Sequence, residues 1–139
     1  MKDSSGDWTN TRTMLDNFAD SGFDVFVGSE TFLLANMQHG GAGCISATAN
    51  VNPAAIDRLF RCWQEADAGE QQQRLDAVRS AVERAALLPS LKAVLARYRN
   101  DPAWETVRPP LVELDAAQVQ ALDQGLDALG FAMPGLNAD

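Results

Sequence analysis

The sequence has few residues of the kinds that bind metals, form disulfides or attract nucleic acids. It holds two cysteines and one histidine, and its 11 basic residues are outnumbered by 19 acidic ones, for a formal net charge of -8. A surface of that sign repels a phosphate backbone, so nucleic acid and anionic membranes are poor partners. Cys44 and Cys62 stand in apolar contexts without a CxxC pair, so we expect buried free thiols and no metal site.

Long apolar runs are absent as well. No stretch approaches the roughly 20 residues needed to cross a bilayer, and no basic segment followed by an apolar one opens the chain. We therefore expect a cytoplasmic protein without a transmembrane helix or a secretory signal. With 46% hydrophobic and 22% charged residues among 139, the chain has the composition of one globular domain.

Residues 1–67 alternate between short apolar runs and helical patterns. A polar turn leads to Asp7 or Thr9, either of which can cap a first helix that ends near Gly22. Asn52 and Pro53 are a typical cap and first residue of a later helix. The predicted strands are 23–27 and 43–47, and the other predicted helices are 31–38 and 53–63. Strands and helices that alternate with short connections indicate parallel strands with right-handed crossovers.

Residues 68–139 show helical periods only. Each of three segments has one apolar stripe, and the stripes are Leu75, Val78, Val82 and Ala85; Leu91, Val94, Leu95 and Tyr98, opened by Pro89; and Val119, Leu122, Leu126 and Leu129. Asp115 and Gln118 have the spacing of a capping box. The linker 102–114 contains two successive prolines and is not expected to be helical throughout.

Four short motifs follow one another along the chain. They are Lys2-Asp3-Ser4-Ser5-Gly6-Asp7, Val27-Gly28-Ser29-Glu30, Gly41-Ala42-Gly43-Cys44-Ile45-Ser46-Ala47-Thr48-Ala49-Asn50 and Arg108-Pro109-Pro110-Leu111. In order and separation they resemble landmarks of the dihydrodipicolinate synthase/N-acetylneuraminate lyase family of class I aldolases. The resemblance covers nearly the whole chain.

The resemblance implies an α/β fold, the C-terminal part of a (β/α)8 TIM barrel (strands 6–8) followed by a C-terminal helical extension. Residues 1–67 would then be a partial barrel and 68–139 the helical region of the same domain. The loops after the strands would lie at the C-terminal face, where barrel active sites form. The family commonly forms homotetramers, so a homo-oligomer is expected.

The resemblance also implies a lyase chemistry in which Lys2 forms a Schiff base with a 2-oxo acid such as pyruvate. The protonated imine is an electron sink through which a carbon–carbon bond forms or breaks, and no separate cofactor is needed. A solvated lysine has a pKa of about 10.4, so the site must remove water from the amine to make it nucleophilic. The family pattern assigns substrate contacts to Gly28, Ser29, Glu30 and Ile45.

Several of these residues have simpler interpretations. Lys2 alone could be a solvated terminal lysine, and Glu30 could favour a helix start through the helix dipole. His39, at a helix end, is expected to be structural, as is Tyr98, the one tyrosine. Ala47 stands where family members that cleave sialic acid have serine, which weakens that substrate, although the motifs lean slightly toward the sugar-acid branch.

The family residues that precede the sixth-strand lysine have no counterpart here. A complete barrel takes about 250 residues, and the proton-relaying tyrosine and the loop that holds the substrate carboxylate cannot be assigned to any residue. The isolated chain is therefore expected to be inactive, as a truncated aldolase. The alternative is a non-catalytic half-barrel that acts in assembly or as an accessory protein, since open strand edges invite association.

Overall fold

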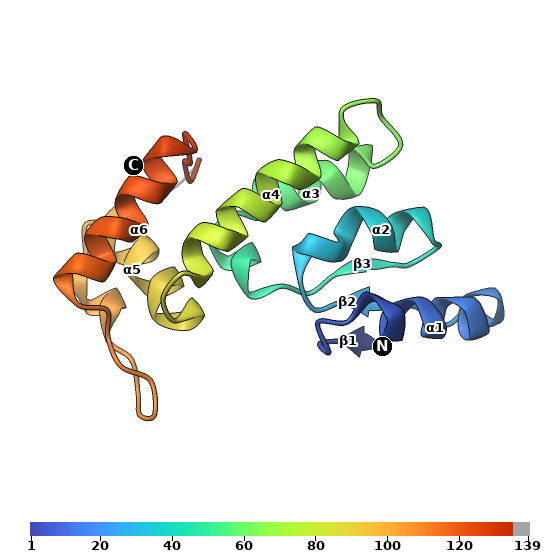
Figure 1. Ribbon diagram of the computed structural model, residues 1–139, viewed down its shortest axis with the longest axis horizontal. Coiled ribbons are helices and arrows are strands. Elements are labelled where there is room, and N and C mark those ends of the chain that lie inside the picture. Colours follow the sequence, from blue (N-terminus) through green and yellow to red (C-terminus); the bar gives the residue numbers. More distant parts are fainter. Residues whose placement is uncertain (135–139) are drawn as a thin grey trace. The chain divides into compact units, whose positions relative to one another are not determined.

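A computed structural model of the chain describes residues 1–134. The chain divides into two compact units, Met1–Asp76 and Ala77–Asp139, so the division falls inside one long helix. The predicted boundary at 67/68 stays a prediction. The elements, labelled in Figure 1, are β1 (Lys2–Asp3), α1 (Trp8–Phe18), η1 (Ala19–Ser21), β2 (Phe26–Val27), η2 (Glu30–Phe32), α2 (Leu33–Gln38), β3 (Gly43–Cys44), η3 (Ala47–Asn50), α3 (Pro53–Cys62), α4 (Ala68–Glu83), α5 (Leu87–Arg99), η4 (Pro102–Glu105) and α6 (Ala116–Ala128).

The first unit contains a parallel sheet in the order β1, β2, β3, as the alternation of strands and helices predicts. The strands are shorter than predicted, since only two residues of each are paired. Phe23, expected in a strand, is 45% exposed and packs edge-on against Phe18 of α1. Ser46 caps η3, and this turn ends the third strand early.

A hydrophobic core in the first unit joins the helices that follow β2 and β3. Its buried members are Leu33, Ile56, Leu59, Ala68 and Leu75. Pro53 begins α3 as predicted, but the Asn52 side chain makes no capping hydrogen bond. Phe60, expected in the buried stripe of α3, is 41% exposed.

A fully buried asparagine links α2 to the sheet. Asn36 Nδ2 donates to the carbonyl oxygens of Val25, at 3.1 Å, and Gly43, at 2.9 Å. The backbone of Gly41 closes the turn after α2 by donating to the Asn36 carbonyl at 2.7 Å. A side chain at position 41 would overlap that of Asn36, so the glycine makes room for this contact. The asparagine thus sets the spacing between the start of β2 and β3.

The second unit is helical, as predicted. Its buried apolar residues include Val82, Val94, Leu122 and Leu126, whereas Leu129 of the predicted stripe is 46% exposed. Helix α5 begins at Leu87, earlier than predicted, and holds its proline in the first turn, where a missing amide hydrogen is tolerated.

Side-chain hydrogen bonds fix both ends of the last helix. Asp115 and Gln118 form the predicted capping box at the start of α6. The Tyr98 hydroxyl donates to the carbonyl oxygen of Phe131, just beyond α6, at 2.8 Å. The predicted linker contains the short turn η4 and then a loop that extends away from the helices of this unit in Figure 1. Among residues 1–134, no helix is both long and apolar enough to cross a bilayer.

Candidate active site

Lys2 lies on the face of the sheet opposite α1. Successive side chains of a strand point to opposite faces, and the side chain of the next residue, Asp3, is bonded to α1. Lys2 must therefore point to the other face, and it is exposed. Its register partner in β2 is Phe26, which is half-buried.

A buried carboxylate beside the lysine anchors the strand to α1. Asp3, 7% exposed, accepts hydrogen bonds from the Ser5 amide (2.9 Å), Ser5 Oγ (3.1 Å), Asn10 Nδ2 (3.2 Å) and Thr11 Oγ1 (2.6 Å). Burial by itself raises the pKa of Asp3, but these hydrogen bonds, led by that of Thr11, hold it below its usual value. The carboxylate thus fixes the backbone that carries Lys2.

Gly28 is packed against the turn that comes after β1. Its amide donates to the Asp3 carbonyl oxygen at 2.6 Å. A Cβ at this position would lie 2.7 Å from that oxygen and 2.9 Å from Ser4 Cα. The absence of a side chain therefore allows the loop after β2 to approach the loop after β1, and the site's lysine and glycine motifs become neighbours.

Ile45 comes directly after β3, on the same open face as Lys2. Its amide donates to the Val27 carbonyl oxygen at 2.9 Å, which continues the register of β3 beyond Cys44. The alternation of side chains places Ile45 on the face of Gly43, the register partner of Phe26, and hence on that of Lys2. Its side chain is 52% exposed. The structure thus brings Lys2, Gly28 and Ile45 to adjacent strands.

Ser29 and Glu30 have hydrogen-bond partners within the protein. Ser29 caps η2 by accepting from the Thr31 amide at 3.3 Å. Glu30 is fully buried, and Ser46 Oγ donates to its carboxylate, which ties the loop after β2 to the loop after β3. The Glu30 carbonyl oxygen also accepts from Gln72 Nε2 at 3.0 Å. A substrate contact by the Glu30 carboxylate would require this loop to rearrange.

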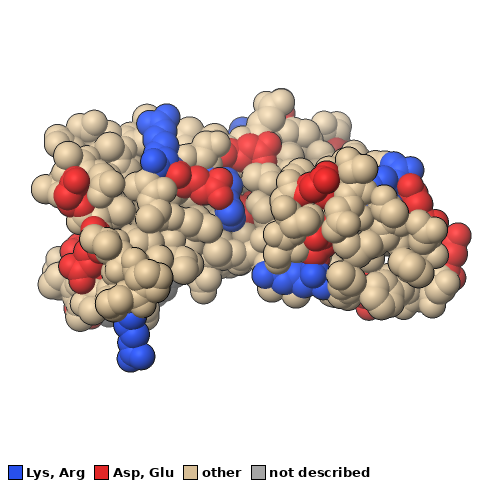
Figure 2. Space-filling view, turned by 60° about the horizontal axis from the view of Figure 1, so that its bottom comes forward, with Lys and Arg blue, Asp and Glu red and all other residues tan. Residues whose placement is uncertain are grey.

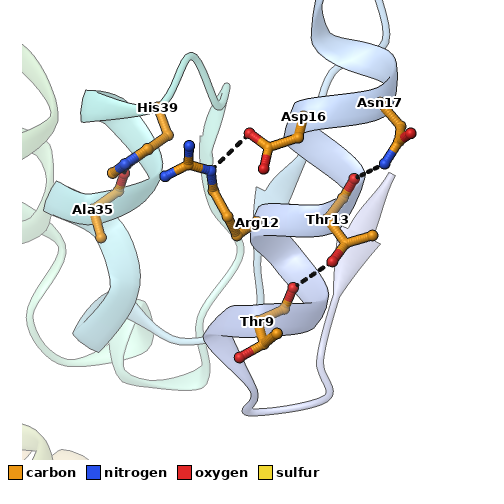
Figure 3. Close-up of polar contacts among 7 residues, drawn as sticks. All are labelled: Thr9, Arg12, Thr13, Asp16, Asn17, Ala35 and His39. Atoms are coloured by element: carbon orange, nitrogen blue, oxygen red, sulfur yellow. Dashed lines mark hydrogen bonds and ion pairs between the residues drawn. The ribbon is translucent and has the colours of Figure 1, made fainter.

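His39 and the charged side chains on α1 lie at the surface. Figure 3 shows His39 Nδ1 beside the Ala35 carbonyl oxygen, at 2.7 Å, within one turn of α2. The same view shows Arg12 paired with Asp16 at 2.7 Å and Asn17 bonded to the Thr13 carbonyl oxygen. These contacts join neighbouring turns of single helices, and the structural role expected of His39 stays a prediction.

The charges on the face shown in Figure 2 are of both signs and are scattered among uncharged residues. The basic side chains in that view do not merge into one continuous patch of the kind that holds a phosphate backbone. Among residues 1–134, no group of three or more histidine, cysteine or acidic side chains is placed to hold a metal ion.

Both cysteines are free and half-buried. Burial, followed by the nearby negative charge of Glu30, raises the pKa of Cys44 to about 11. Since the thiolate is the reactive form, we expect iodoacetamide to label Cys44 slowly at pH 7 and faster at each step up to about pH 11. Mass spectrometry of the peptide that contains Cys44 measures this rate. A rate that levels off by pH 9 would contradict the expected pKa.

The sequence alone did not reveal the buried polar groups of the first unit. Asp3, Asn36 and Ser46 are all buried, yet none belongs to an apolar stripe or a metal-ligand pattern. One signal was present for Asn36, because it lies three residues after Leu33 on the buried side of α2. For Asp3 the signal was the run of small hydroxyl residues after it, which can donate to a carboxylate.

Comparison with known proteins places the fold in a family. The model of the dihydrodipicolinate synthetase family matches residues 1–129. An uncharacterised DapA-like lyase from Chloroflexus aurantiacus is 32% identical over 123 residues, which are 88% of this chain and 40% of that protein. A 4-hydroxy-tetrahydrodipicolinate synthase from Methanococcoides burtonii is 28% identical over 132 residues, 94% of this chain and 45% of that protein.

Solved structures of the same family agree with this match. Dihydrodipicolinate synthase from Agrobacterium tumefaciens aligns with a TM-score of 0.76 at 26% identity, over 92% of this chain and 42% of that one. A prophage protein of the dihydrodipicolinic acid synthase family from E. coli, solved in complex with pyruvate, aligns with a TM-score of 0.83 at 23% identity, over 94% of this chain and 46% of that one. The fold is thus part of the barrel of these enzymes.

The chain spans less than half the length of these relatives. The sheet of three parallel strands with intervening helices agrees with the match of residues 1–129 to the family model. The chain therefore belongs to the dihydrodipicolinate synthetase family, and it corresponds to less than half the length of these family members.

Proposed function

We propose that this chain is the C-terminal part, strands 6–8 and the helical extension, of a class I aldolase or lyase that acts on a 2-oxo acid such as pyruvate. Lys2 is the residue that forms the Schiff base. The observation that carries the proposal is the placement of Lys2 on the face of a parallel sheet opposite α1, in a chain that belongs to the dihydrodipicolinate synthetase family. The pyruvate complex of the E. coli relative supports the choice of substrate class.

The chemistry needs one amine and a site that keeps water away from it. Lys2 Nζ attacks the ketone carbon of the 2-oxo acid, and loss of one water molecule gives a protonated imine. Loss of a proton from the neighbouring carbon then gives an enamine, whose carbon attacks an aldehyde, and hydrolysis returns the lysine. In the reverse direction the same imine releases the aldehyde.

The other residues of the proposed site differ in their possible roles. Ile45 offers an exposed apolar surface on the face of Lys2, against which the carbon chain of a 2-oxo acid would pack. Gly28 keeps space open between the first two loops, and Ser29 lies beside it on the loop after β2. Glu30, fully buried, supports these loops through Ser46 and would contact the distal part of a substrate only after a rearrangement.

A second function, a non-catalytic element of assembly, is supported by a separate observation. In residues 1–134 the sheet has three strands, and β1 and β3 each pair on one side only. Unpaired strand edges favour association with another polypeptide. This function needs no amine chemistry, so the two candidates differ in whether Lys2 reacts with a 2-oxo acid.

Reductive trapping separates them. The chain is incubated with pyruvate and borohydride, and the modified residue is mapped by mass spectrometry. The chain has two lysines, Lys2 and Lys92, so Lys92 is an internal control that shares the same solution. We expect modification of Lys2 to exceed that of Lys92, and the variant Lys2→Met to lose the preferred site. Equal modification of both lysines in the folded chain would reject imine formation by this chain alone and favour the assembly function.

A further inference from the structure

Two phenylalanine side chains form an exposed aromatic pair where the chain passes from α1 to β2 (Figure 1). Phe18, the last residue of α1, is 52% exposed, and Phe23, in the segment that leads to β2, is 45% exposed. Their ring centroids are 6.0 Å apart at an interplanar angle of 61°, an edge-to-face arrangement. Apolar side chains exposed singly are ordinary, whereas two that pair at the surface form a patch that a partner can cover.

The backbone between the two rings is fixed by hydrogen bonds. The Phe23 amide donates to the Phe18 carbonyl oxygen at 3.3 Å, and the Gly22 amide donates to the Ala19 carbonyl oxygen at 3.0 Å. Gly22 has a φ of 73°, in the left-handed region that glycine adopts without strain. This is the Schellman pattern of helix ends, which brings the residues that flank it into contact. The aromatic pair is therefore already arranged before any partner binds.

Two free carboxylates lie beside the rings. Asp20 is in the turn between them and Asp24 follows Phe23, and both side chains are exposed. Within residues 1–134, neither carboxylate has an ion pair or a hydrogen bond. The amino group of Met1 donates to the backbone carbonyl oxygen of Asp24, not to its carboxylate. Both negative charges are thus available to a partner.

The end of α1 adds a third source of negative potential. The last carbonyl groups of a helix carry partial negative charge, which basic side chains often offset. The last turn of α1 contains no basic residue. Arg12, further back on this helix, is paired with Asp16 at 2.7 Å. Carbonyl groups, carboxylates and the faces of phenyl rings all attract cations, so the three features favour the same kind of ligand.

We propose that Phe18, Asp20, Phe23 and Asp24, which we call the α1 patch, bind an arginine-bearing segment of another polypeptide. A guanidinium group is planar, so it stacks on a phenyl ring while its N–H groups donate to a carboxylate. The exposed area of two rings also accommodates an apolar side chain next to the arginine, which a small free cation lacks. The proposal is independent of the chemistry of Lys2 and of the strand edges, because the patch lies outside the sheet.

The test titrates this protein with a synthetic tripeptide, a leucine between two arginines with both ends blocked, and follows the backbone amide signals by NMR. We expect the signals of residues 17–24 to shift and saturate, while those of α3 stay in place. The same peptide with citrulline in place of both arginines has nearly the same shape but no charge, and we expect it to bind about tenfold more weakly. No shift at residues 17–24, or equal affinity for the two peptides, would overturn the proposal.

Two double variants separate the α1 patch from the overall charge. Asp20→Asn with Asp24→Asn removes two charges from the patch, and Glu65→Gln with Glu70→Gln removes two from exposed positions elsewhere. We expect the first pair to weaken binding of the arginine peptide about fivefold and the second to leave it nearly unchanged. Both should keep the circular dichroism spectrum of the parent chain. Equal weakening by the two pairs would mean that only the net charge attracts the peptide, against the proposal.

Leucine substitutions separate the ring from its apolar contact. Phe18→Leu keeps an apolar side chain but removes the phenyl face, so we expect the affinity for the arginine peptide to fall about threefold. Phe60→Leu, at a position on α3 that is 41% exposed, is the control and should leave the affinity unchanged. An affinity that survives Phe18→Leu intact would contradict stacking of the guanidinium. Light scattering completes the test, since a dimer of this chain that Phe18→Leu dissociates would make a second copy the occupant and overturn the proposal.

Discussion

Replacing Asp3 by asparagine is expected to lower the free energy of unfolding by about 2 to 3 kcal/mol, the value of hydrogen bonds to a buried charged acceptor. One carboxylate oxygen accepts from Thr11 Oγ1, Ser5 Oγ and Asn10 Nδ2, and the other from the Ser5 amide. In either orientation of an asparagine side chain at position 3, its NH₂ group would face some of these donors. Those donors would then lack an acceptor. Urea unfolding at pH 7 measures the loss.

The matched control is Asp16→Asn on the surface of α1. Asp16 pairs with Arg12 at 2.7 Å, but both side chains are about half exposed, 43% for Arg12 and 55% for Asp16. Exposed ion pairs within a helix contribute about 0.3 to 0.5 kcal/mol. We therefore expect Asp16→Asn to change the stability far less than Asp3→Asn, and similar losses for both would contradict the role of Asp3.

The effect of Asp3→Asn should also depend on pH. The folded-state pKa of Asp3 is lowered relative to its ordinary value of 3.8. The contribution of a group with a lowered pKa is complete above the unfolded pKa and is lost as the pH falls through the folded pKa. The stability difference between the parent chain and Asp3→Asn should therefore be full at pH 7 and shrink below about pH 4. A difference that grows on acidification would contradict this assignment.

Replacing Asn36 by aspartate is expected to destabilise the protein more, by about 3 to 5 kcal/mol, the usual loss for an uncompensated buried charge. The change preserves shape but turns two donated hydrogen bonds, to the Val25 and Gly43 carbonyl oxygens, into repulsion between oxygens. Protonation would relieve the repulsion, so the loss should be smaller at pH 4 than at pH 7. Chemical unfolding at the two pH values measures both effects.

Asn17→Asp is the control for that substitution. Asn17 also donates to a backbone carbonyl oxygen, that of Thr13 at 2.7 Å, but it does so on the exposed side of α1. Surface substitutions of this kind usually change stability by less than about 0.5 kcal/mol. If Asn36→Asp were tolerated as well as Asn17→Asp, the buried contacts of Asn36 would not set the spacing of β2 and β3.

The sequence predicted the order and type of most elements. Parallel strands, the helix start at Pro53 and the capping box at Asp115 all derive from local signals, namely alternation, proline position and side-chain spacing. Where local patterns failed, the cause was the tertiary environment. Phe18 and Leu129 continue apolar stripes but lie at helix ends, where the stripe passes the edge of the core and the side chains are exposed.

The candidate site was predicted less completely than the fold. Lys2, Gly28 and Ile45 came from motifs, and the sheet brings them to neighbouring strands, while their roles stay predictions. The contacts that hold them could not be predicted, because they join residues separated along the chain, such as Ser46 with Glu30. Spacing rules describe periodic elements, whereas these hydrogen bonds depend on how loops after different strands meet.

Water around the lysine explains why a lone piece of barrel would be a poor catalyst. An amine in bulk solvent is mostly protonated at neutral pH, and removing water favours its neutral, nucleophilic form. Lys2 is exposed on the open face, and the rest of a complete barrel would enclose it under the proposed function. The chemistry and the assembly of this protein are therefore coupled in the proposed function.

The most direct measurement is the rate at which pyruvate and borohydride modify Lys2 at pH 7, with and without the segment of the Chloroflexus lyase that lies outside the matched region, produced as a separate chain. Lys92, the other lysine, is followed in the same samples. We expect this added segment to raise the rate at Lys2 at least tenfold and to leave the rate at Lys92 unchanged. If a stable mixed complex forms and the rate at Lys2 stays equal to that at Lys92, Lys2 is not the Schiff-base residue.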